Sequence, residues 1–504
     1  MLLFIAKYEW LLLKANRMLL LLAAITAFVL FFALFEGHRR VSFQRETLAQ
    51  VSLQEKTDYA RYRQQLAAAN QGQHFDGGHF GDPSNPFYFG NRMGARYAVL
   101  PPDAMAILSA GQSDMYPYYY KITLSKKQAL YHSEDPENPQ VLSSGRFDVS
   151  FVIIFLLPLL VIGFTYNVYS SEKEAGTLLL LMAQNVPVEK VVACRFVVRY
   201  LLFSLYFNAL LLAGLALFGV SLTASFSEAA TMVAITLLYT AFWFALSYWL
   251  NSFKKTSGFT ATALTGAWLL AVFIVPSIIS TVVDALHPLP SRLRLITQSR
   301  NISDSLAKKG NSLSRFLEEH PEFKPAAQDP KDRNATTLRT RLETEVLMEK
   351  EKAAFAAVTE KRRALVNSYR FFSPALFVQQ DLNMAAGTND EQYLGFDKQA
   401  SAFQQRFRRY FEPLVYRQER FSVNLLDNVP LFLPAQKAAF RPFASTAGTD
   451  MLFLSVLIAV LVLAAHQNRP GNKKQQQFNV TAKPGGVGYR KLTREGGKLT
   501  QQDL

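Results

Sequence analysis

Residues 149–169 read VSFVIIFLLPLLVIGFTYNVY and contain no Asp, Glu, Lys, Arg or His. A hydrocarbon layer about 30 Å thick is crossed by about 20 apolar residues in a helix, so this stretch predicts a membrane span. Five further stretches approach the same length. Taken together, the predicted spans are 18–36, 149–169, 198–220, 229–250, 260–283 and 448–466. The expected fold class is therefore an α-helical polytopic membrane protein.

Positive charges in the short connections set the predicted orientation. Lys and Arg residues lie before the first span, between the second and third, between the fourth and fifth, and after the sixth. All four groups fall on one side, so both termini are predicted to be cytoplasmic in a cell inner membrane. The formal net charge of +15 is read as this topology signal. Nucleic-acid binding is the weaker interpretation, because the basic residues form no recognisable domain.

The two ends of the chain differ from the spans in composition. The stretch 1–17 is amphipathic and predicts an elbow at the cytoplasmic surface, with a plain extension of span one as the alternative. Span one itself is expected to remain as an anchor. The basic, Gly-rich stretch 467–504 is predicted to be a disordered cytoplasmic tail.

Two long extracytoplasmic segments, 37–148 and 284–447, exceed ordinary loop length and are each expected to fold as a domain or half-domain. The first is predicted to continue span one as a helix over 41–70 and to hold a strand over 118–123. The only cysteine, Cys194, lies near the cytoplasmic end of span three, so no disulfide can stabilise these segments.

The second outside segment is predicted to be mainly helical. Its expected helices are 338–369, 374–386 and 391–411, with Gly387 ending the middle one. The last helix carries an aromatic stripe of Phe396, Phe403, Phe407 and Phe411. Such a stripe at helical spacing indicates core packing rather than a ligand site.

Residues that ion-coupled carriers and enzymes use are missing from the sequence. No span has an ionisable residue in its apolar core, which disfavours an ion-driven carrier or a channel with a charged filter. No phosphate-binding loop or nucleophile motif occurs, so the chain is not expected to be an enzyme, and any nucleotide-driven work must come from a partner. His74, Asp76, His79 and Asp82 form an outside cluster, but the Gly-rich loop lacks fixed ligand spacing, and solvated turn residues explain them better than a metal.

The segment 170–195, between spans two and three, carries the most informative motif. It contains Ser171-Glu172-Lys173-Glu174-Ala175-Gly176-Thr177-Leu178. Ser171 and Glu174 have the spacing of a capping box, and the two glutamates suit the positive end of a helix dipole. Beyond Gly176 the sequence turns apolar, so this helix is expected to lie along the membrane surface and dock on a partner.

This motif resembles the coupling helix of type 2 ABC transporter permeases. The resemblance rests on Glu172, Glu174, Gly176, Thr177 and Leu178, followed by Leu180-Leu181-Met182-Ala183-Gln184 and by Arg195 where the next span begins. The six spans and the amphipathic start agree with that family. More narrowly, the chain resembles the large-loop permeases associated with multi-copper-enzyme maturation. That likeness is carried by Leu100-Pro101-Pro102, Gly111-Gln112-Ser113-Asp114, Phe371-Phe372-Ser373-Pro374-Ala375 and Ala386-Gly387-Thr388.

The sequence also departs from the family pattern at two positions. Asn185 stands where a proline is common, with Pro187 two residues later, and Cys194 replaces a common glycine. The sequence does not favour copper as the substrate, because the spans contain no series of Cys, Met or His residues that could bind it along a path.

The resemblance implies a membrane subunit that forms a homo- or heterodimer and pairs with cytoplasmic ABC ATPase subunits. Glu172 and Glu174 would offer charge to the ATPase. Gly176 and Thr177 would form part of the coupling helix, in which Gly176 would permit a close approach of the ATPase. Leu178 would pack on the membrane domain. ATP hydrolysis would then drive export, or movement of the outside segments against an extracytoplasmic protein. The alternative is a non-transport membrane scaffold or sensor whose outside segments bind a ligand or an extracytoplasmic partner, and in which the motif is a solvated interfacial helix.

Overall fold

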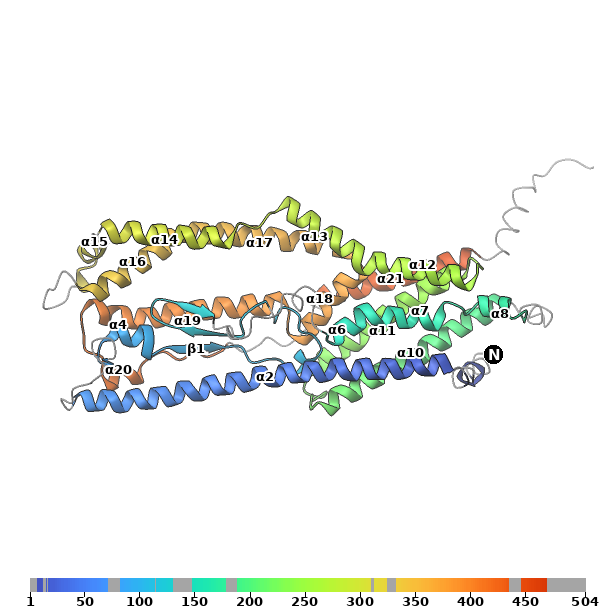
Figure 1. Cartoon of the computed structure of the whole chain (residues 1–504), viewed down its shortest axis with the longest axis horizontal. Coiled ribbons are helices and arrows are strands. Elements are labelled where there is room, and N and C mark those ends of the chain that lie inside the picture. The colour runs from blue at the N-terminus through green and yellow to red at the C-terminus, as the bar shows by residue number, and fades with distance from the viewer. Residues whose placement is uncertain are drawn as a thin grey trace, which may run out of the picture.

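The computed structural model of the chain describes residues 7–11, 15, 17–70, 82–113, 115–129, 147–177, 188–309, 312–323, 332–434 and 446–468. Within these residues, six helical segments are long and apolar enough to cross a membrane. The protein is therefore an α-helical polytopic membrane protein, as predicted. It is elongated, with the spans gathered at one end and the other helices at the opposite end (Figure 1). The predicted tail lies outside the described residues beyond Asn468.

Four spans are continuous helices, and the second and fifth each contain a π-helical turn. In chain order the spans are α2 (Arg17–Asn70); α6 (Val149–Phe151), η3 (Val152–Leu156) and α7 (Leu157–Thr165); α10 (Val188–Leu217); α11 (Phe226–Asn251); α12 (Ser257–Leu269), η4 (Leu270–Ile274) and α13 (Val275–Leu286); and α21 (Thr446–Gln467). Pro158 lies just after η3, and because proline has no N–H, a carbonyl in the preceding turn loses its partner. The Tyr239 hydroxyl donates to the Ile154 carbonyl at 3.1 Å. A neighbouring span thus satisfies the freed group.

α2 continues far beyond the membrane. It is one helix of 54 residues, which at 1.5 Å per residue is about 80 Å long, against about 30 Å for the hydrocarbon layer. The helical continuation predicted over 41–70 is confirmed. In Figure 1, α2 runs along one edge of the molecule from the spans to the far end. A single rod therefore joins a span to the outside part of the chain.

The two outside segments form one outer domain, which consists of the second half of α2 with residues 82–129 and 292–434. Its further elements are α4 (Pro86–Tyr88), η1 (Phe89–Met93), β1 (Arg96–Val99), η2 (Ala104–Ile107), β2 (Tyr119–Ile122), β3 (Lys127–Ala129), α14 (Arg292–Lys309), α15 (Ser312–Glu319), η5 (Pro321–Phe323), α16 (Arg333–Leu347), α17 (Glu349–Tyr369), η6 (Arg370–Phe372), α18 (Pro374–Ala386), α19 (Asp390–Tyr416) and α20 (Val423–Asp427). The strands form an antiparallel sheet in the order β1-β2-β3, with Tyr97 opposite Lys121. The strand predicted over 118–123 is β2.

An aromatic core joins the two outside segments. The predicted stripe on α19, Phe396, Phe403, Phe407 and Phe411, is buried throughout. Phe411 stacks on Phe89 of η1 with ring centroids 6.2 Å apart. The stripe is therefore core packing between segments that are far apart in the sequence, as predicted.

The structure confirms one predicted helix end between residues 338 and 387 and adds a helix break that was not predicted. α18 ends as predicted, because Gly387 takes a φ of 66°, the left-handed conformation that favours glycine at a helix end. The single helix predicted over 338–369 is instead α16 and α17, which meet at Met348 with its side chain buried at the junction. Helical periodicity continues on both sides of such a break, so the sequence pattern does not locate it.

α18 packs in the core of the span bundle and not only with the outer domain. Phe377 and Leu382 of α18 belong to the same buried cluster as residues of the second, third and fourth spans. Just before α18, Ser373 Oγ donates to the Ala271 carbonyl of η4 at 2.7 Å. That carbonyl lies one π-turn before Pro276, which has no N–H to offer it. The outer domain is thus bonded directly to the middle of the fifth span.

A second buried connection ties η2 to the second span. Asp148 Oδ1 accepts the Phe151 N–H at 2.8 Å at the start of that span, and Oδ2 accepts the Ala110 N–H at 2.7 Å. Ser109 Oγ donates to Asn383 Oδ1 of α18 at 2.6 Å. These bonds hold the outer ends of the spans and the base of the outer domain in one geometry.

A buried ion pair joins the outer domain to the sixth span. Arg370 Nη2 of η6 lies 2.7 Å from Asp450 Oδ1 of α21, and both side chains are almost completely buried. Asp381 of α18 is also buried. Its burial, and next the charge of Asp450, raise the pKa of Asp381 to about 8. We call Arg370, Asp381 and Asp450 the junction triad, in which one guanidinium faces two carboxyl groups.

Gly37 allows η2 to lie directly against α2. A Cβ at this position would lie 2.1 Å from the backbone carbonyl oxygen of Ile107. We expect Gly37→Ala to displace η2 and lower the free energy of unfolding by about 1–3 kcal/mol. Gly266→Ala in α12 is the matched control, since nothing lies within 4 Å of a Cβ there. The unfolding midpoints of the purified variants in detergent test this, and equal midpoints would contradict the close contact.

Candidate coupling site

α8 (Ser170–Glu174) continues the second span and does not start a new helix. The N-cap residue is Tyr169, which makes no side-chain capping bond, and the Ser171 N–H already donates to the Asn167 carbonyl at 2.9 Å. The predicted capping box of Ser171 and Glu174 is therefore wrong. A capping box needs free backbone donors at a helix start, and the turns that precede α8 already supply an acceptor for Ser171.

Glu172 is bound within the chain. Its Oε1 lies 2.8 Å from Arg195 Nη1 of α10, and the Thr177 hydroxyl donates to its Oε2. Its charge is thus directed towards α10, whereas the sequence predicted that it would face a partner. Gly176 has a φ of 73°, and nothing in the described chain lies within 4 Å of a Cβ there. Glycine is needed at this position for the turn, and the described chain makes no close approach to it.

Glu9 of the elbow is completely buried between two arginines of α10. Arg199 Nε donates to Glu9 Oε2 at 2.9 Å. Arg195 Nε lies 3.1 Å from Glu9 Oε1, an ion-pair contact whose angle is not that of a hydrogen bond. Arg199 Nη1 also donates to the Phe164 carbonyl at 2.7 Å. We call Glu9, Glu172, Arg195 and Arg199 the inner ion network.

The inner ion network has two acids and two arginines, so its charges balance, as buried charges require. It joins the elbow, α8 and α10. Arg195 and Arg199 are four residues apart and share a face of α10, which is a signal that the sequence contains. Their partner Glu9 lies 190 positions before Arg199, and no local pattern indicates that distant pairing.

Glu174 connects α8 to the fifth span. Its Oε1 accepts the N–H of Ser257, the first residue of α12, at 3.0 Å. An anion at a helix N-terminus is favourable, because the first backbone N–H groups have no partner within the helix. The Thr256 side chain caps the same helix by accepting the Phe259 N–H at 3.4 Å. α8 therefore has bonds to both the third and the fifth spans.

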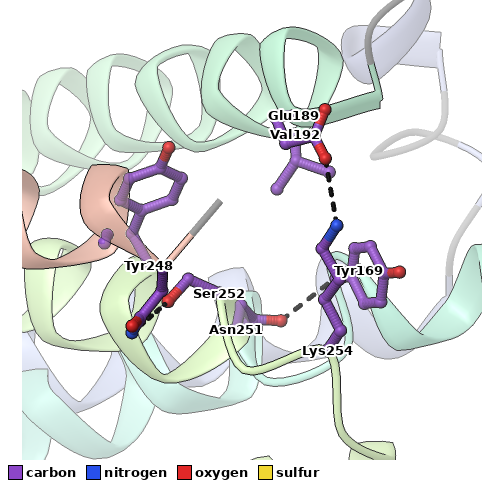
Figure 2. A pocket seen from close by; sticks show the side chains of 9 residues that line it. Tyr169, Glu189, Val192, Tyr248, Asn251, Ser252 and Lys254 are labelled. Carbon is purple, nitrogen blue, oxygen red and sulfur yellow. Dashed lines mark hydrogen bonds and ion pairs between the residues drawn. The ribbon is translucent and has the colours of Figure 1, made fainter. Parts of the chain in front are cut away.

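A small cavity of about 30 Å³ lies beside α8, where the ends of the second, third, fourth and sixth spans meet (Figure 2). Lys254 Nζ lies 3.0 Å from Glu189 Oε1 at its edge, and the Tyr169 N–H donates to Asn251 Oδ1 at 3.4 Å. The cavity has room for water but not for a transported substrate. The cavity lies where the ends of four spans meet beside Tyr169, the residue that precedes α8.

Several predicted residues lie outside the described part of the chain. They include Leu178 with the apolar stretch that follows, and His74, Asp76 and His79. Asp82 is described, and its carboxylate accepts the N–H and the hydroxyl of Ser84 at 2.8 and 2.7 Å. No group of three or more metal-binding side chains occurs among the residues that the structure describes.

The comparisons with known proteins bear on the outer domain. Residues 292–435 match the family model for a domain of unknown function, DUF3526. The match runs from α14 to just beyond α20 and includes α18, but none of the spans. No curated protein and no solved structure matches the chain.

Proposed function

We propose that this chain is the membrane subunit of an ABC-type assembly in a cell inner membrane, with both termini in the cytoplasm. A separate ATPase subunit binds at the α8 segment, and two membrane subunits form the working dimer. The single observation that supports this best is the inner ion network. It ties the segment that carries the family motif to the elbow and the third span through buried charges.

Two bonded routes lead from α8 towards the outer domain. One passes through Glu172 and Arg195 to Glu9 in the elbow, which precedes the rod α2. The other passes through Glu174 to the first turn of α12, and from η4 through the Ala271 carbonyl to Ser373 before α18. Buried polar contacts hold one geometry, so displacement of α8 is passed on and not absorbed locally.

These contacts favour movement of the outer domain as the work done, with export as the second form. α2 is one helix from the membrane into the outer domain, and α18 is bonded into the span bundle. Both features transmit displacement. The cavity beside α8 has no room for a substrate.

Glu174→Lys is expected to reduce coupling to the ATPase without preventing membrane insertion. A lysine would place positive charge at the N-terminus of α12, where the helix dipole is also positive, and would break the bond to Ser257. The measurement is ATP hydrolysis and co-purification of the ATPase from native membranes. Glu319→Lys is the matched control, since it makes the same charge change at an exposed site on α15. Unchanged hydrolysis and co-purification in Glu174→Lys would overturn the proposal and favour a scaffold or sensor.

Spin labels distinguish movement of the outer domain from export. Leu217 at the end of the span helix α10 and Val346 on α16 of the outer domain are 71% and 67% exposed and suit paired labels in a Cys194→Ala background. We expect the distance distribution between the labels to change when a non-hydrolysable ATP analogue binds the assembly. An unchanged distribution, together with substrate uptake into inverted vesicles, would instead support export.

A further inference from the structure

A groove of about 570 Å³ opens on the outer domain between α2, β1 and the chain around α20. Its volume is in the range of about 300–1,000 Å³ that is typical of ligand sites. Val51 and Tyr59 line it from α2, Val99 from β1, and Leu431 and Phe432 from the chain after α20. The groove therefore combines these apolar side chains with charged ones, which are Glu55, Lys56, Arg63, Arg96 and Asp427.

β1 presents a partly open strand edge to this groove. The Leu100 N–H donates to the Tyr118 carbonyl on the β2 side, so by alternation the backbone groups of Tyr97 and Val99 point away from β2. Glu55 of α2 accepts the Tyr97 N–H at 3.3 Å. No strand of the described chain pairs with this side of β1. α2 therefore covers the edge at Tyr97, and Val99 is the position where the described chain leaves the edge open to another strand.

The charged side chains that line the groove have one excess positive charge. Arg96 pairs with Glu55 at 2.8 Å, and Arg63 pairs with Asp427. Lys56 is the remaining charged residue of the lining, and its side chain is exposed. An occupant with an acidic group would therefore complement the groove.

The position of the groove along α2 excludes the lipid of the bilayer as its occupant. Val51 follows residue 36, the predicted end of span one, by enough helix to place it about 22 Å further along the rod. Lipid tails do not extend that far beyond the hydrocarbon layer. Leu431 is 58% exposed and adds accessible apolar surface to the groove.

We propose that this groove binds an extended polypeptide segment of an extracytoplasmic protein, which hydrogen-bonds to the open edge of β1 at Val99. Alternate apolar side chains of that segment pack against Leu431 and Phe432, and an acidic residue lies near Lys56. Main-chain hydrogen bonds to Val99 supply affinity, and the pockets for alternate side chains supply specificity. This inference goes beyond ATPase coupling and does not require it.

The test is site-directed photocrosslinking in native membranes with p-benzoylphenylalanine at Ser52, which is exposed and lines the groove. We expect adducts that mass spectrometry locates on one short segment of an extracytoplasmic protein. The control places the same group at Leu53, which is 66% exposed but does not line the groove, and which should give few such adducts.

Two second-site variants test how the segment binds. Val99→Pro removes an N–H that β2 does not use, as proline is tolerated on the outer side of an edge strand. Lys56→Glu reverses the excess charge. Each should lower the yield of the Ser52 adduct about fivefold, the effect of losing roughly one hydrogen bond or ion contact. The proposal is overturned by no adduct at Ser52, by adducts only to lipid or a second copy, or by a yield that neither variant changes. None of these results bears on the ATPase test at Glu174.

Discussion

Arg195→Met is expected to lower the free energy of unfolding by about 3–5 kcal/mol and to abolish stimulated ATP hydrolysis. The substitution leaves the buried Glu9 with Arg199 alone and removes the only arginine that contacts Glu172 in the described chain. A buried charge that loses its partner costs more than the pair itself contributes. The measurements are the unfolding midpoint of the purified chain in detergent and the ATPase rate of the complex.

Two further variants separate the loss of charge at Arg195 from the loss of packing. Arg195→Lys keeps the charge but loses the planar group that reaches both acids, so we expect an intermediate loss. Adding Glu172→Gln to Arg195→Met removes the charge that Arg195→Met leaves without an arginine, and it should recover part of the stability, which a double-mutant cycle measures. If Arg195→Met unfolds at the wild-type midpoint, the inner ion network does not stabilise the protein.

Arg370→Met is expected to have the second largest effect, a loss of about 3–5 kcal/mol at neutral pH. It removes the guanidinium that lies 2.7 Å from Asp450 and leaves that buried carboxylate without a counter-charge, next to Asp381. Adding Asp450→Asn to Arg370→Met should restore much of the loss, since the remaining carboxyl group, Asp381, holds a proton at neutral pH. The readout is the unfolding midpoint, and Arg362→Met, at a partly exposed pair with Asp284, serves as the control with a smaller effect. Equal effects of the two arginine variants would contradict the role of the junction triad.

The pH dependence of stability tests the protonation of Asp381. Its folded-state pKa of about 8 lies above the ordinary value near 4, so the folded chain holds a proton that the unfolded chain releases. The corresponding stability is fully present below about pH 4 and is lost as the pH rises through about 8. Asp381→Asn should therefore flatten the change in unfolding midpoint between pH 5 and pH 9, relative to the wild type. Identical pH profiles would show that Asp381 does not carry this proton.

The sequence predicted features that depend on near neighbours. The spans follow from apolar length, and the end of α18 follows from Gly387, because only glycine takes that conformation at low cost. The aromatic stripe on α19 follows from helical spacing. The prediction of a capping box was wrong, although Ser171 and Glu174 have the right spacing. α8 continues the helical turns that precede it, so it has no free helix start to cap.

The candidate site was only partly predictable. The motif located Glu172, Glu174 and Thr177, and Arg195 was recognised as the basic residue at the next span. The contact between Glu172 and Arg195 depends on how the second and third spans pack. The burial of Glu9 between the two arginines depends on the packing of the elbow against α10. Pairings between residues so far apart leave no local pattern.

By itself, the amino-acid sequence determined that this is a six-span helical membrane protein with a long helical rod, two outside segments and a charged segment between spans two and three. Hydropathy and helical period are properties of continuous stretches of sequence, so the chain alone expresses them. The tertiary structure alone decided that the two segments share one core, that α18 packs among the spans, and that buried charges join α8 to the elbow. Those features depend on the burial and charge of residues that folding brings together from distant parts of the chain.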